Sequence, residues 1–285
     1  MAIQVGVGLF TTGVTVDVVA WRFISSPGSP TSWTSFLGMQ DLTGQVAWIT
    51  GAGTGIGEAG AIALAEAGCP VVLSGRRLEP LEAVAAKITA AGGTADIEQL
   101  DVSDKAAVAA VVGRILERHG RIDIGVFSAG LNVRERNWPV VTTDGWDDVI
   151  NIDLNGAFYC CHAALPSMRA NGGGLIINIS SMASKGVSPL TGPAYTAAKH
   201  AMNAMTASLA VEERNNGIRA TAISPGEVAT PILDLRPVPV SDEDKARLLQ
   251  SEDLGEVIRF VAQMPPHVTL DEVLITPTYN RFLAG

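Results

Sequence analysis

Residues 50–57 read TGAGTGIG and follow the apolar run VAWI at residues 46–49. Glycine is needed wherever a Cβ would strike a bound group or force a disallowed φ. The segment EAGAIALAEAG, which comes next, is a strong helix former. A tight turn between a strand and a helix presents unpaired backbone N–H groups, and the helix dipole adds partial positive charge there. The stretch therefore predicts a phosphate-binding turn in an α/β fold.

The spacing of the glycines is T-G-x-x-x-G-x-G, with Gly51, Gly55 and Gly57 in the glycine places. The pattern G-x-G-x-x-G does not fit, because Ile56 stands where its last glycine would fall. A tight turn that binds no ligand is the alternative. The strand before the turn and the helix after it favour a nucleotide site.

Short β-branched runs alternate with long alanine-rich stretches from Leu42 onward. We expect strands at residues 45–50, 71–74, 95–100, 122–127, 175–179, 219–223 and 273–276. Helical patterns lie between them at residues 59–67, 79–91, 106–119, 146–170 and 195–215. This alternation predicts a Rossmann-type α/β fold, in which a doubly wound parallel sheet of about seven strands is covered by helices on both faces.

The composition restricts the class of protein. The chain has 285 residues, of which 47% are hydrophobic, so it can form one large domain. Its net charge of −9, with scattered basic residues, disfavours nucleic acid and anionic lipid as partners. The three cysteines form neither a disulfide framework nor a metal-binding spacing. We therefore expect a reduced, cytoplasmic protein with no metal site and no membrane association.

Residues 1–38 differ in composition from the rest of the chain. Residues 3–24 are moderately apolar, but they contain Asp17 and no basic start, so they make a poor signal peptide and a poor membrane span. Residues 25–35, SSPGSPTSWTS, are typical of a flexible tether. We expect a disordered extension before a domain at residues 39–285; the alternative is a start-codon artefact with Met39 as the true first residue.

The second expected strand, PVVLSG, ends where a nucleotide-binding fold chooses its nucleotide. A carboxylate normally grips the ribose 2′-OH of NAD there, but this chain has Gly75, followed by Arg76 and Arg77. An arginine can hold a 2′-phosphate bidentately, so NADP is favoured, with NAD or dual use as the alternative. Asp101, at the end of the third strand, is expected to contact the adenine or to cap the helix that starts near Lys105.

The segment YTAAK places Tyr195 and Lys199 one turn apart on one face of a helix. A phenol with a pKa of about 10 is a poor proton shuttle at neutral pH, but a neighbouring ammonium lowers that pKa. Upstream, the strand GLIINIS ends at Ser180 and Ser181, at the edge where parallel sheets bind ligands. A serine there can hold a substrate carbonyl oxygen while Tyr195 donates a proton to it.

With these motifs, residues 42–277 resemble a classical short-chain dehydrogenase/reductase, matched by TGAGTGIG, SAG, NISS, YTAAK and ISPGEVATP. The resemblance implies hydride transfer between a nicotinamide and a small carbonyl or secondary alcohol. It implies that Ser181 polarises the substrate, Tyr195 is the acid/base, and Lys199 binds the nicotinamide ribose and lowers the tyrosine pKa. The cofactor-binding residues that we expect are Gly51, Thr54, Gly55, Ile56, Gly57, Arg76, Arg77, Asp101, Val102, Ala129, Gly130, Tyr195, Lys199, Pro225, Gly226, Val228 and Thr230.

Two places depart from the family pattern. The family's NNAG element reads FSAG here, with Phe127 and Ser128 in place of both asparagines. In WDDVINIDLNG, the place of the family's catalytic asparagine holds Asp153. Aspartate can supply the same backbone carbonyl, but its carboxylate can also pair with Lys199 and weaken the effect of that lysine on the tyrosine. A nucleotide-binding sensor or scaffold that has lost turnover is therefore the alternative to an active enzyme.

The C-terminal residues 260–281, FVAQMPPHVTLDEVLITPTYNR, are similar to those of NADP-dependent enzymes that oxidise serine, threonine and other 3-hydroxy acids. Arg134, Arg136 and Arg236 are candidates for binding a substrate carboxylate, with solvated surface charges as the alternative. The family usually associates through its long helices, so we expect a homodimer or homotetramer; the alternative is that these helices only cover the sheet.

Overall fold

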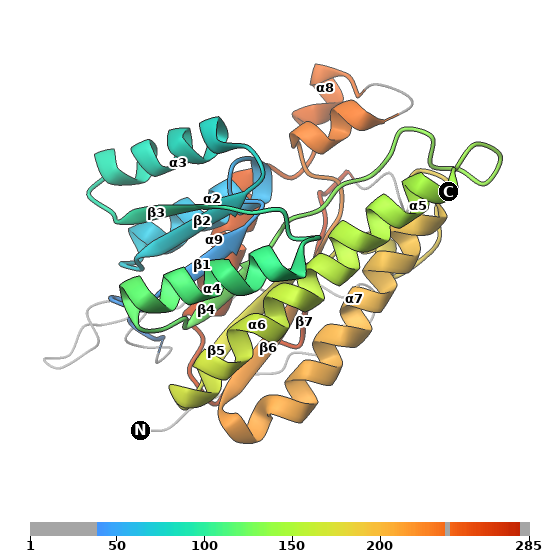
Figure 1. The fold of residues 1–285 in the computed structure, drawn as a ribbon. Helices are drawn as coiled ribbons and strands as arrows, with labels where there is room; N and C mark the ends of the chain where they lie inside the picture. The colour runs from blue at the N-terminus through green and yellow to red at the C-terminus, as the bar shows by residue number, and fades with distance from the viewer. Residues whose placement is uncertain (1–38, 237–239, 280–285) are drawn as a thin grey trace, which may run out of the picture. The chain divides into compact units, whose positions relative to one another are not determined.

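The computed structural model describes residues 39–236 and 240–279, so the expected disordered extension at residues 1–38 lies outside the described residues. Within them, seven strands form one parallel sheet in the order β3-β2-β1-β4-β5-β6-β7. This confirms the predicted fold class (Figure 1). The ends of each strand differ from those expected by at most two residues. The strands are β1 (Ala47–Thr50), β2 (Val71–Gly75), β3 (Ala95–Gln99), β4 (Ile124–Phe127), β5 (Gly174–Ile179), β6 (Ile218–Pro225) and β7 (Glu272–Ile275).

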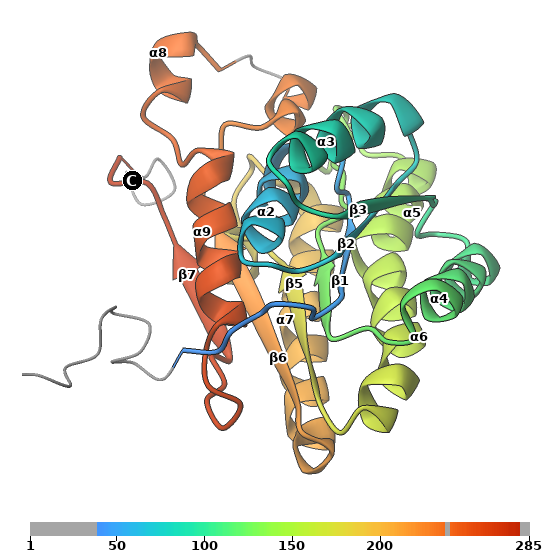
Figure 2. The same ribbon diagram turned by 90° about the vertical axis from the view of Figure 1, so that its left-hand side faces the viewer.

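Two apolar layers form because successive residues of a strand point to opposite faces of the sheet. In β1, Ala47 and Ile49 pack on one face, against α2 (Gly55–Glu66), α3 (Leu78–Ala90) and α9 (Ser251–Ala262). Trp48 packs on the other face, which α4 (Lys105–His119), α6 (Ala157–Ala170) and α7 (Gly192–Glu213) cover. Figure 2 shows α2 and α9 on one side of the strands and α4 and α6 on the other. Both faces are therefore buried, as the continuous apolar strands predict.

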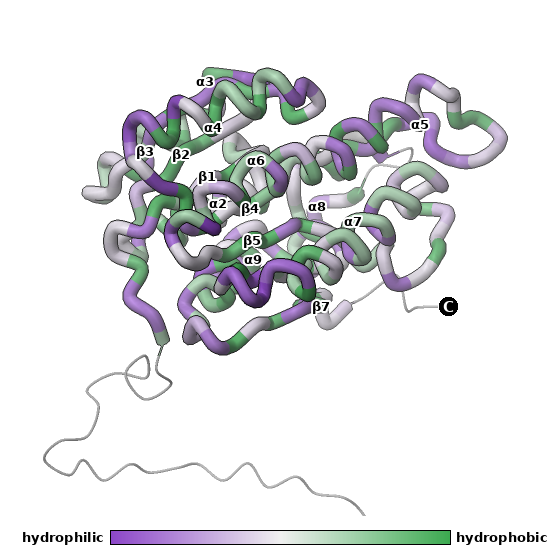
Figure 3. The backbone as a smooth tube through the Cα atoms, turned by 60° about the horizontal axis from the view of Figure 1, so that its bottom comes forward, coloured by the Kyte–Doolittle hydropathy of each residue, from purple (hydrophilic) through white to green (hydrophobic). Residues whose placement is uncertain are grey.

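The helices that cover the sheet pack apolar residues against it. In Figure 3, hydrophobic residues gather on the inner strands, whereas hydrophilic and hydrophobic residues alternate along α3 and α4. The side chain of Asp104 accepts hydrogen bonds from the N–H groups of Ala106 and Ala107, so Asp104 caps α4 and Asp101 does not. No helix in residues 39–236 and 240–279 is both long and apolar enough to cross a membrane.

The prediction of one continuous helix at residues 146–170 is wrong for the middle of that range. The chain forms α5 (Thr143–Ile150), then a π-helical segment, η1 (Asn151–Gly156), and only then α6. The wider π turn shifts the side chains that follow it around the helix axis, and such turns are frequent at functional sites. Here the shift turns the side chain of Asp153 into the protein, where it is completely buried.

Short 3₁₀ helices and one small α-helix complete the described fold. They are η2 (Met182–Ser184), η3 (Arg214–Asn216), η4 (Pro231–Leu235) and α8 (Asp242–Lys245). Of these, η2 follows β5 and η4 follows β6, so both lie beyond the carboxyl ends of central strands. That edge of a parallel sheet is where ligands bind, because the loops there converge.

Candidate active site

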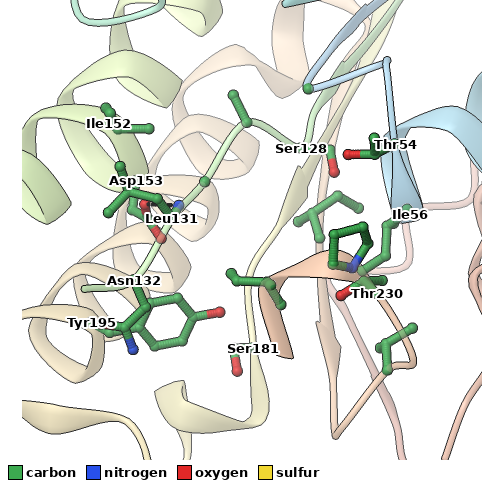
Figure 4. A pocket seen from close by; sticks show the side chains of 18 of the residues that line it. Thr54, Ile56, Ser128, Leu131, Asn132, Ile152, Asp153, Ser181, Tyr195 and Thr230 are labelled. Atoms are coloured by element: carbon green, nitrogen blue, oxygen red, sulfur yellow. Dashed lines mark hydrogen bonds between the residues drawn. The ribbon is translucent and has the colours of Figure 1, made fainter. Parts of the chain in front are cut away.

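A cleft of about 480 Å³ opens along this edge of the sheet. Its wall is built from the glycine turn after β1, the ends of β2 and β4, η1, the end of β5, α7 and the segment after β6. All of the predicted catalytic and cofactor-binding residues except Gly57 are part of the wall, and of the three candidate arginines Arg136 and Arg236 are part of it and Arg134 is not. In Figure 4, Thr54, Ile56 and Thr230 lie on one side of this cleft, and Asp153, Leu131 and Tyr195 lie on the other. The sequence motifs therefore come together in one place.

Two glycines of the turn have positive φ and little room for a side chain. Gly51 has a φ of +65°, and a Cβ there would lie 2.8 Å from the backbone nitrogen of Ala129. Gly55 has a φ of +61°, and a Cβ there would lie 3.1 Å from the methyl group of Thr230. α2 begins directly at this turn, and its N-cap residue, Thr54, makes no side-chain capping hydrogen bond. The first N–H groups of α2 are thus left for a ligand, which fits the phosphates of a dinucleotide.

Two arginines border the cleft next to the end of β2. Arg76 and Arg77 are both exposed, and Gln99 Nε2 donates a hydrogen bond to the Arg76 carbonyl oxygen at 2.7 Å. Asp101 lies close by, and its Oδ1 accepts hydrogen bonds from Ser103 N–H and Ser103 Oγ. Burial acts to raise the Asp101 pKa, but these hydrogen bonds and the Arg76 charge outweigh it, so the pKa is lowered. This end of the cleft is cationic and open, as a 2′-phosphate requires.

The two serines at the end of β5 have different surroundings. Ser180 is buried, and its hydroxyl donates to the backbone carbonyl of Lys199 at 3.3 Å. Ser181 is half-buried, and its hydroxyl oxygen accepts a hydrogen bond from Ala183 N–H at 3.1 Å. Figure 4 shows Ser181 beside the hydroxyl end of Tyr195. The orientation of Ser181 is thus fixed by η2, while Ser180 anchors α7 to the sheet.

Lys199 lies one turn after Tyr195 on α7 and is 3% exposed. Its Nζ donates a hydrogen bond to the Ile179 carbonyl oxygen at 3.0 Å. The same Nζ lies 3.3 Å from Asp153 Oδ2 and 5.3 Å from the centre of the Tyr195 ring. The ammonium therefore contacts a carbonyl, a carboxylate and the face of the ring that it is expected to influence.

Asp153 occupies the place of the family's asparagine and makes two contacts. Its Oδ1 accepts a hydrogen bond from Leu131 N–H at 2.8 Å, which fixes the segment after β4. Its Oδ2 forms the ion pair with Lys199. A Cβ on Gly130 would lie 3.3 Å from Oδ2, so the carboxylate packs closely against the SAG segment. The ion pair that we expected with Lys199 is present.

These contacts set the protonation of the site. Burial raises the pKa of the Tyr195 phenol, and the Asp153 carboxylate raises it further; Lys199, Ser181 and Arg136 oppose both, but the pKa stays above its ordinary value. Burial acts to lower the Lys199 pKa, but attraction to Asp153 and Tyr195 raises it overall. Burial also raises the Asp153 pKa, against the effect of Lys199. The lysine acts on the phenol in the expected direction, but in this structure it does not lower the tyrosine pKa overall.

Polar residues outside the sequence motifs also line the cleft, among them Arg136, which the sequence offers as a candidate for binding a carboxylate. Asn132 is buried, and its Nδ2 donates to the Thr191 carbonyl at 3.0 Å. Arg136 is 6% exposed, and its guanidinium donates to the carbonyls of Val133 and Leu190. Arg136 is thus part of the wall and not a solvated surface charge, whereas Arg134 is exposed and lies off the wall. Polar residues directly after a central strand, as in LNVRER, were the available signal.

The wall of the cleft also includes Arg236 and Glu227. Their side chains form an ion pair at 2.5 Å, and Glu227 is buried. Glu227 follows the proline-glycine turn at Pro225 and Gly226, so β6 places it over the cleft. The charged groups of Arg236 and Glu227 therefore already have partners in the protein.

Phe127 explains one of the two departures from the family pattern. Its ring is buried and meets the Trp48 ring edge-on at 5.3 Å between centroids. Trp48 in turn donates a hydrogen bond from Nε1 to Ser74 Oγ at 3.0 Å. An aromatic pair thus joins β1 and β4 at this position. Ser128 and Ala129 still line the cleft beyond it.

A family model described as short chain dehydrogenase matches residues 45–237. An uncharacterized oxidoreductase of Staphylococcus aureus (strain USA300) is 34% identical over 241 residues, which cover 84% of this chain and 100% of that protein. A 3beta-hydroxysteroid dehydrogenase of Mediterraneibacter gnavus is 38% identical over 186 residues, which cover 65% of this chain and 67% of that protein. A glycine betaine reductase of Emericella nidulans is 34% identical over 241 residues, and the chain spans 19% of its length.

Solved structures agree with these sequence matches. A metagenomic short-chain oxidoreductase, crystallised in complex with NADP, is 34% identical and superposes with a TM-score of 0.73. The match covers 84% of this chain and 99% of that chain.

Proposed function

The chain belongs to the short chain dehydrogenase family of oxidoreductases, and from that premise we propose that it is an NADP-dependent enzyme acting on small carbonyl compounds and secondary alcohols, with Tyr195 as the acid/base. The observation that carries the proposal is the meeting of Ser181, Tyr195 and Lys199 in one cleft with the glycine turn. Chance occurrence of Y-x-x-x-K in a helix does not account for that convergence.

The nicotinamide, when bound, supplies or accepts the hydride. In the reductive direction, the Ser181 hydroxyl donates a hydrogen bond to the substrate carbonyl oxygen, and Tyr195 donates its proton to that oxygen. In the oxidative direction, the Tyr195 phenolate accepts the proton of the substrate alcohol. Lys199 stabilises the phenolate that remains after the proton has left.

The lining of the cleft supports a dinucleotide as the ligand. The other residues proposed to contact it, which include Val102, Gly130, Val228 and Thr230, line the same cleft as the glycine turn and Tyr195. Arg76 and Arg77 are proposed to bind the 2′-phosphate, with NAD as the alternative. The complex of NADP with a structure 34% identical to this chain supports the preference. The steroid dehydrogenase among the relatives supports a secondary alcohol as the substrate class.

We also propose that the protein forms a homodimer or homotetramer and works in the cytoplasm. Trp146 on α5, Phe158 on α6 and Val211 on α7 are exposed, so these helices carry apolar surface beyond what the sheet covers. All three cysteines are free thiols, which fits a reducing compartment. Sedimentation velocity tests the assembly: a monomer at micromolar concentration would contradict it.

The decisive experiment follows nicotinamide absorbance with NADP(H) and with NAD(H) across a panel of ketones, keto acids, secondary alcohols and hydroxy acids. We expect turnover with NADP(H) and at least one member of the panel. Tight binding of NADP without turnover, across the panel and at every pH tested, would instead support a sensor or scaffold.

A further inference from the structure

The carboxylate of Asp153 is unusual in being fully buried beside the acid/base pair. The π-helical segment η1 directs it inward, and Leu131 N–H satisfies one of its oxygens. Its other oxygen, Oδ2, has no hydrogen-bond partner among the described residues, although it lies 3.3 Å from Lys199 Nζ. A carboxylate removed from water needs a compensating cation, because an unpaired buried charge costs several kcal/mol. Lys199 is the cation in contact with it.

Lys199 is held by the same arrangement. Its Nζ donates to the Ile179 carbonyl at the end of β5 and faces Asp153 in η1. Both of these partner residues, Ile179 and Asp153, are themselves buried. The ammonium is therefore fixed over the ring of Tyr195, and its positive charge is largely met by one carboxylate.

No other charged group described near Tyr195 pairs with Lys199 in place of Asp153. Arg136 acts on the phenol from the segment after β4, and Arg134 and Arg236 act on Arg136. Arg236 is paired with Glu227. The remaining charges on the described elements packed against α7 all lie on its neighbours. Asp144, Asp147 and Asp148 on α5 and Arg214 on η3 are exposed. Lys185, after η2, pairs with Glu272 on β7, and Arg219 on β6 donates to the Val268 carbonyl.

We propose that Asp153 is a positioning residue for the reaction proposed above: it fixes and neutralises Lys199, so that Tyr195 keeps its proton to a higher pH than a neutral residue at position 153 would allow. The inference rests on the proposed function for its catalytic meaning, but the charge arrangement itself is tested without turnover.

The sign follows from the charges. A carboxylate near the phenol disfavours the phenolate, and it also cancels the ammonium that would favour it. Replacing Asp153 with a neutral residue of the same shape leaves Lys199 unopposed, so the Tyr195 pKa falls. The Lys199 pKa falls as well, because burial of the ammonium is no longer compensated. Carbonyl reduction needs the protonated phenol and alcohol oxidation needs the phenolate, so both pH limbs move to lower pH.

Asp153→Asn is the matched substitution. An asparagine Oδ1 can still accept the hydrogen bond from Leu131 N–H, so this variant removes the charge and keeps the anchor. Asp148→Asn is the control, because Asp148 is an exposed carboxylate on the neighbouring helix α5. Circular dichroism and thermal unfolding establish that each variant is folded.

The direct measurement is a titration of tyrosinate ultraviolet absorbance. The chain has three tyrosines, so each protein is compared with its own Tyr195→Phe counterpart, and the difference isolates Tyr195. We expect the wild-type Tyr195 midpoint above the ordinary value of about 10. We expect Asp153→Asn to lower it by about one pH unit or more, a tenfold change in phenolate at a given pH, and Asp148→Asn to leave it unchanged.

The pH dependence of kcat/KM, measured for oxidation and reduction, supplies the second readout. We expect the limbs of both profiles to shift to lower pH in Asp153→Asn and to stay in place in Asp148→Asn. A Tyr195 midpoint that is the same in wild type and Asp153→Asn, or higher in Asp153→Asn, overturns the inference. If no substrate is turned over, the proposed function fails, whereas the titration still decides the role of Asp153. Should Asp153→Asn not fold, Asp153→Ser, which is also neutral and is smaller, takes its place in both measurements, and an unchanged Tyr195 midpoint there overturns the inference.

Discussion

A Cβ atom on Gly57 would lie 2.3 Å from the carbonyl oxygen of Gly51. The two ends of the glycine turn therefore pack directly against each other, and this contact requires no bound ligand. The absence of a side chain at Gly57 therefore allows both the tight turn and the close packing of α2 on β1.

Gly57→Ala is expected to destabilise the protein by about 1–3 kcal/mol or more, as overpacking does, because backbone on both sides must move. The measurement is chemical denaturation, with NADP affinity as a second readout. Gly113→Ala is the control: Gly113 lies within α4 and is exposed, and a Cβ there would have no atom within 4 Å. The control should stabilise α4 by about 0.5–1 kcal/mol; a Gly57→Ala protein as stable as wild type would refute the packing argument.

Arg76→Ala combined with Arg77→Ala is expected to weaken NADP binding by about tenfold to a hundredfold, since hydrogen bonds to charged groups contribute about 1.5–3 kcal/mol. NAD affinity should change little. Calorimetric titration with each nucleotide measures both, and Arg214→Ala, an exposed arginine in η3, is the control. Equal losses for the two nucleotides would show that the arginines do not contact the 2′-phosphate.

Gly75→Asp should act in the complementary way. A Cβ at Gly75 meets Leu81 at an ordinary 3.5 Å, so the position accepts a side chain. A carboxylate at the end of β2 can bind a ribose 2′-OH and repels a 2′-phosphate. We expect the ratio of NAD to NADP affinity to rise at least about tenfold, equivalent to 1.4 kcal/mol. An unchanged ratio would place the adenosine ribose elsewhere.

Tyr195→Phe is expected to lower kcat by about 10²–10⁴-fold, the usual contribution of a positioned proton donor, while NADP affinity is retained. Steady-state kinetics and calorimetric titration separate the two effects. Tyr159→Phe is the matched control, since Tyr159 lies on α6 and is not part of the cleft wall. Turnover at the wild-type rate in Tyr195→Phe would remove the assigned role.

Acid should loosen the edge strand β7. Glu272 accepts hydrogen bonds from Ser224 Oγ at 2.8 Å and Asn203 Nδ2 at 2.9 Å, and it pairs with Lys185. Burial acts to raise its pKa, but these partners outweigh it and the pKa is lowered. A lowered pKa means that Glu272 contributes stability above its unfolded-state pKa and loses it as the pH falls through the folded-state value.

Glu272→Gln is therefore expected to be less stable than wild type at neutral pH, by about 1 kcal/mol because the site is partly exposed, and equally stable in strong acid. Urea unfolding across the pH range measures the difference. A gap between the two proteins that stays constant into strong acid would contradict this account.

The alternation of apolar strands and alanine-rich helices was enough to predict all seven strands, because burial on both faces leaves a continuous signal in each strand. The π turn at Asn151–Gly156 was not predictable, because residues 146–170 keep a helical apolar pattern and a one-residue change in hydrogen-bond register leaves no mark in composition. The sequence offered Arg136 as a candidate but could not choose between a site residue and a solvated charge, because an arginine is usually exposed and only the packed loop around Arg136 shows that it is part of the wall.

The site motifs predicted which residues meet, since parallel strands bring their carboxyl ends to one edge. They indicated that Asp153 can weaken the effect of Lys199 on Tyr195, but not how that effect balances against burial. The resemblance implied a lysine that lowers the tyrosine pKa, but burial and Asp153 act in the opposite direction and outweigh it. That balance depends on distances of a few ångströms and on the exclusion of solvent. Neither can be derived from the spacing of residues in the sequence.

The sheet order also has a consequence for how the cleft comes into being. β1 lies between β2 and β4, so Gly51 and Ala129, which lie against each other, are supplied by the two halves of the sheet. Neither half of the sheet alone forms both sides of the binding cleft. A ligand that contacts both segments binds only when they are assembled, so saturation with it is expected to stabilise the two halves together.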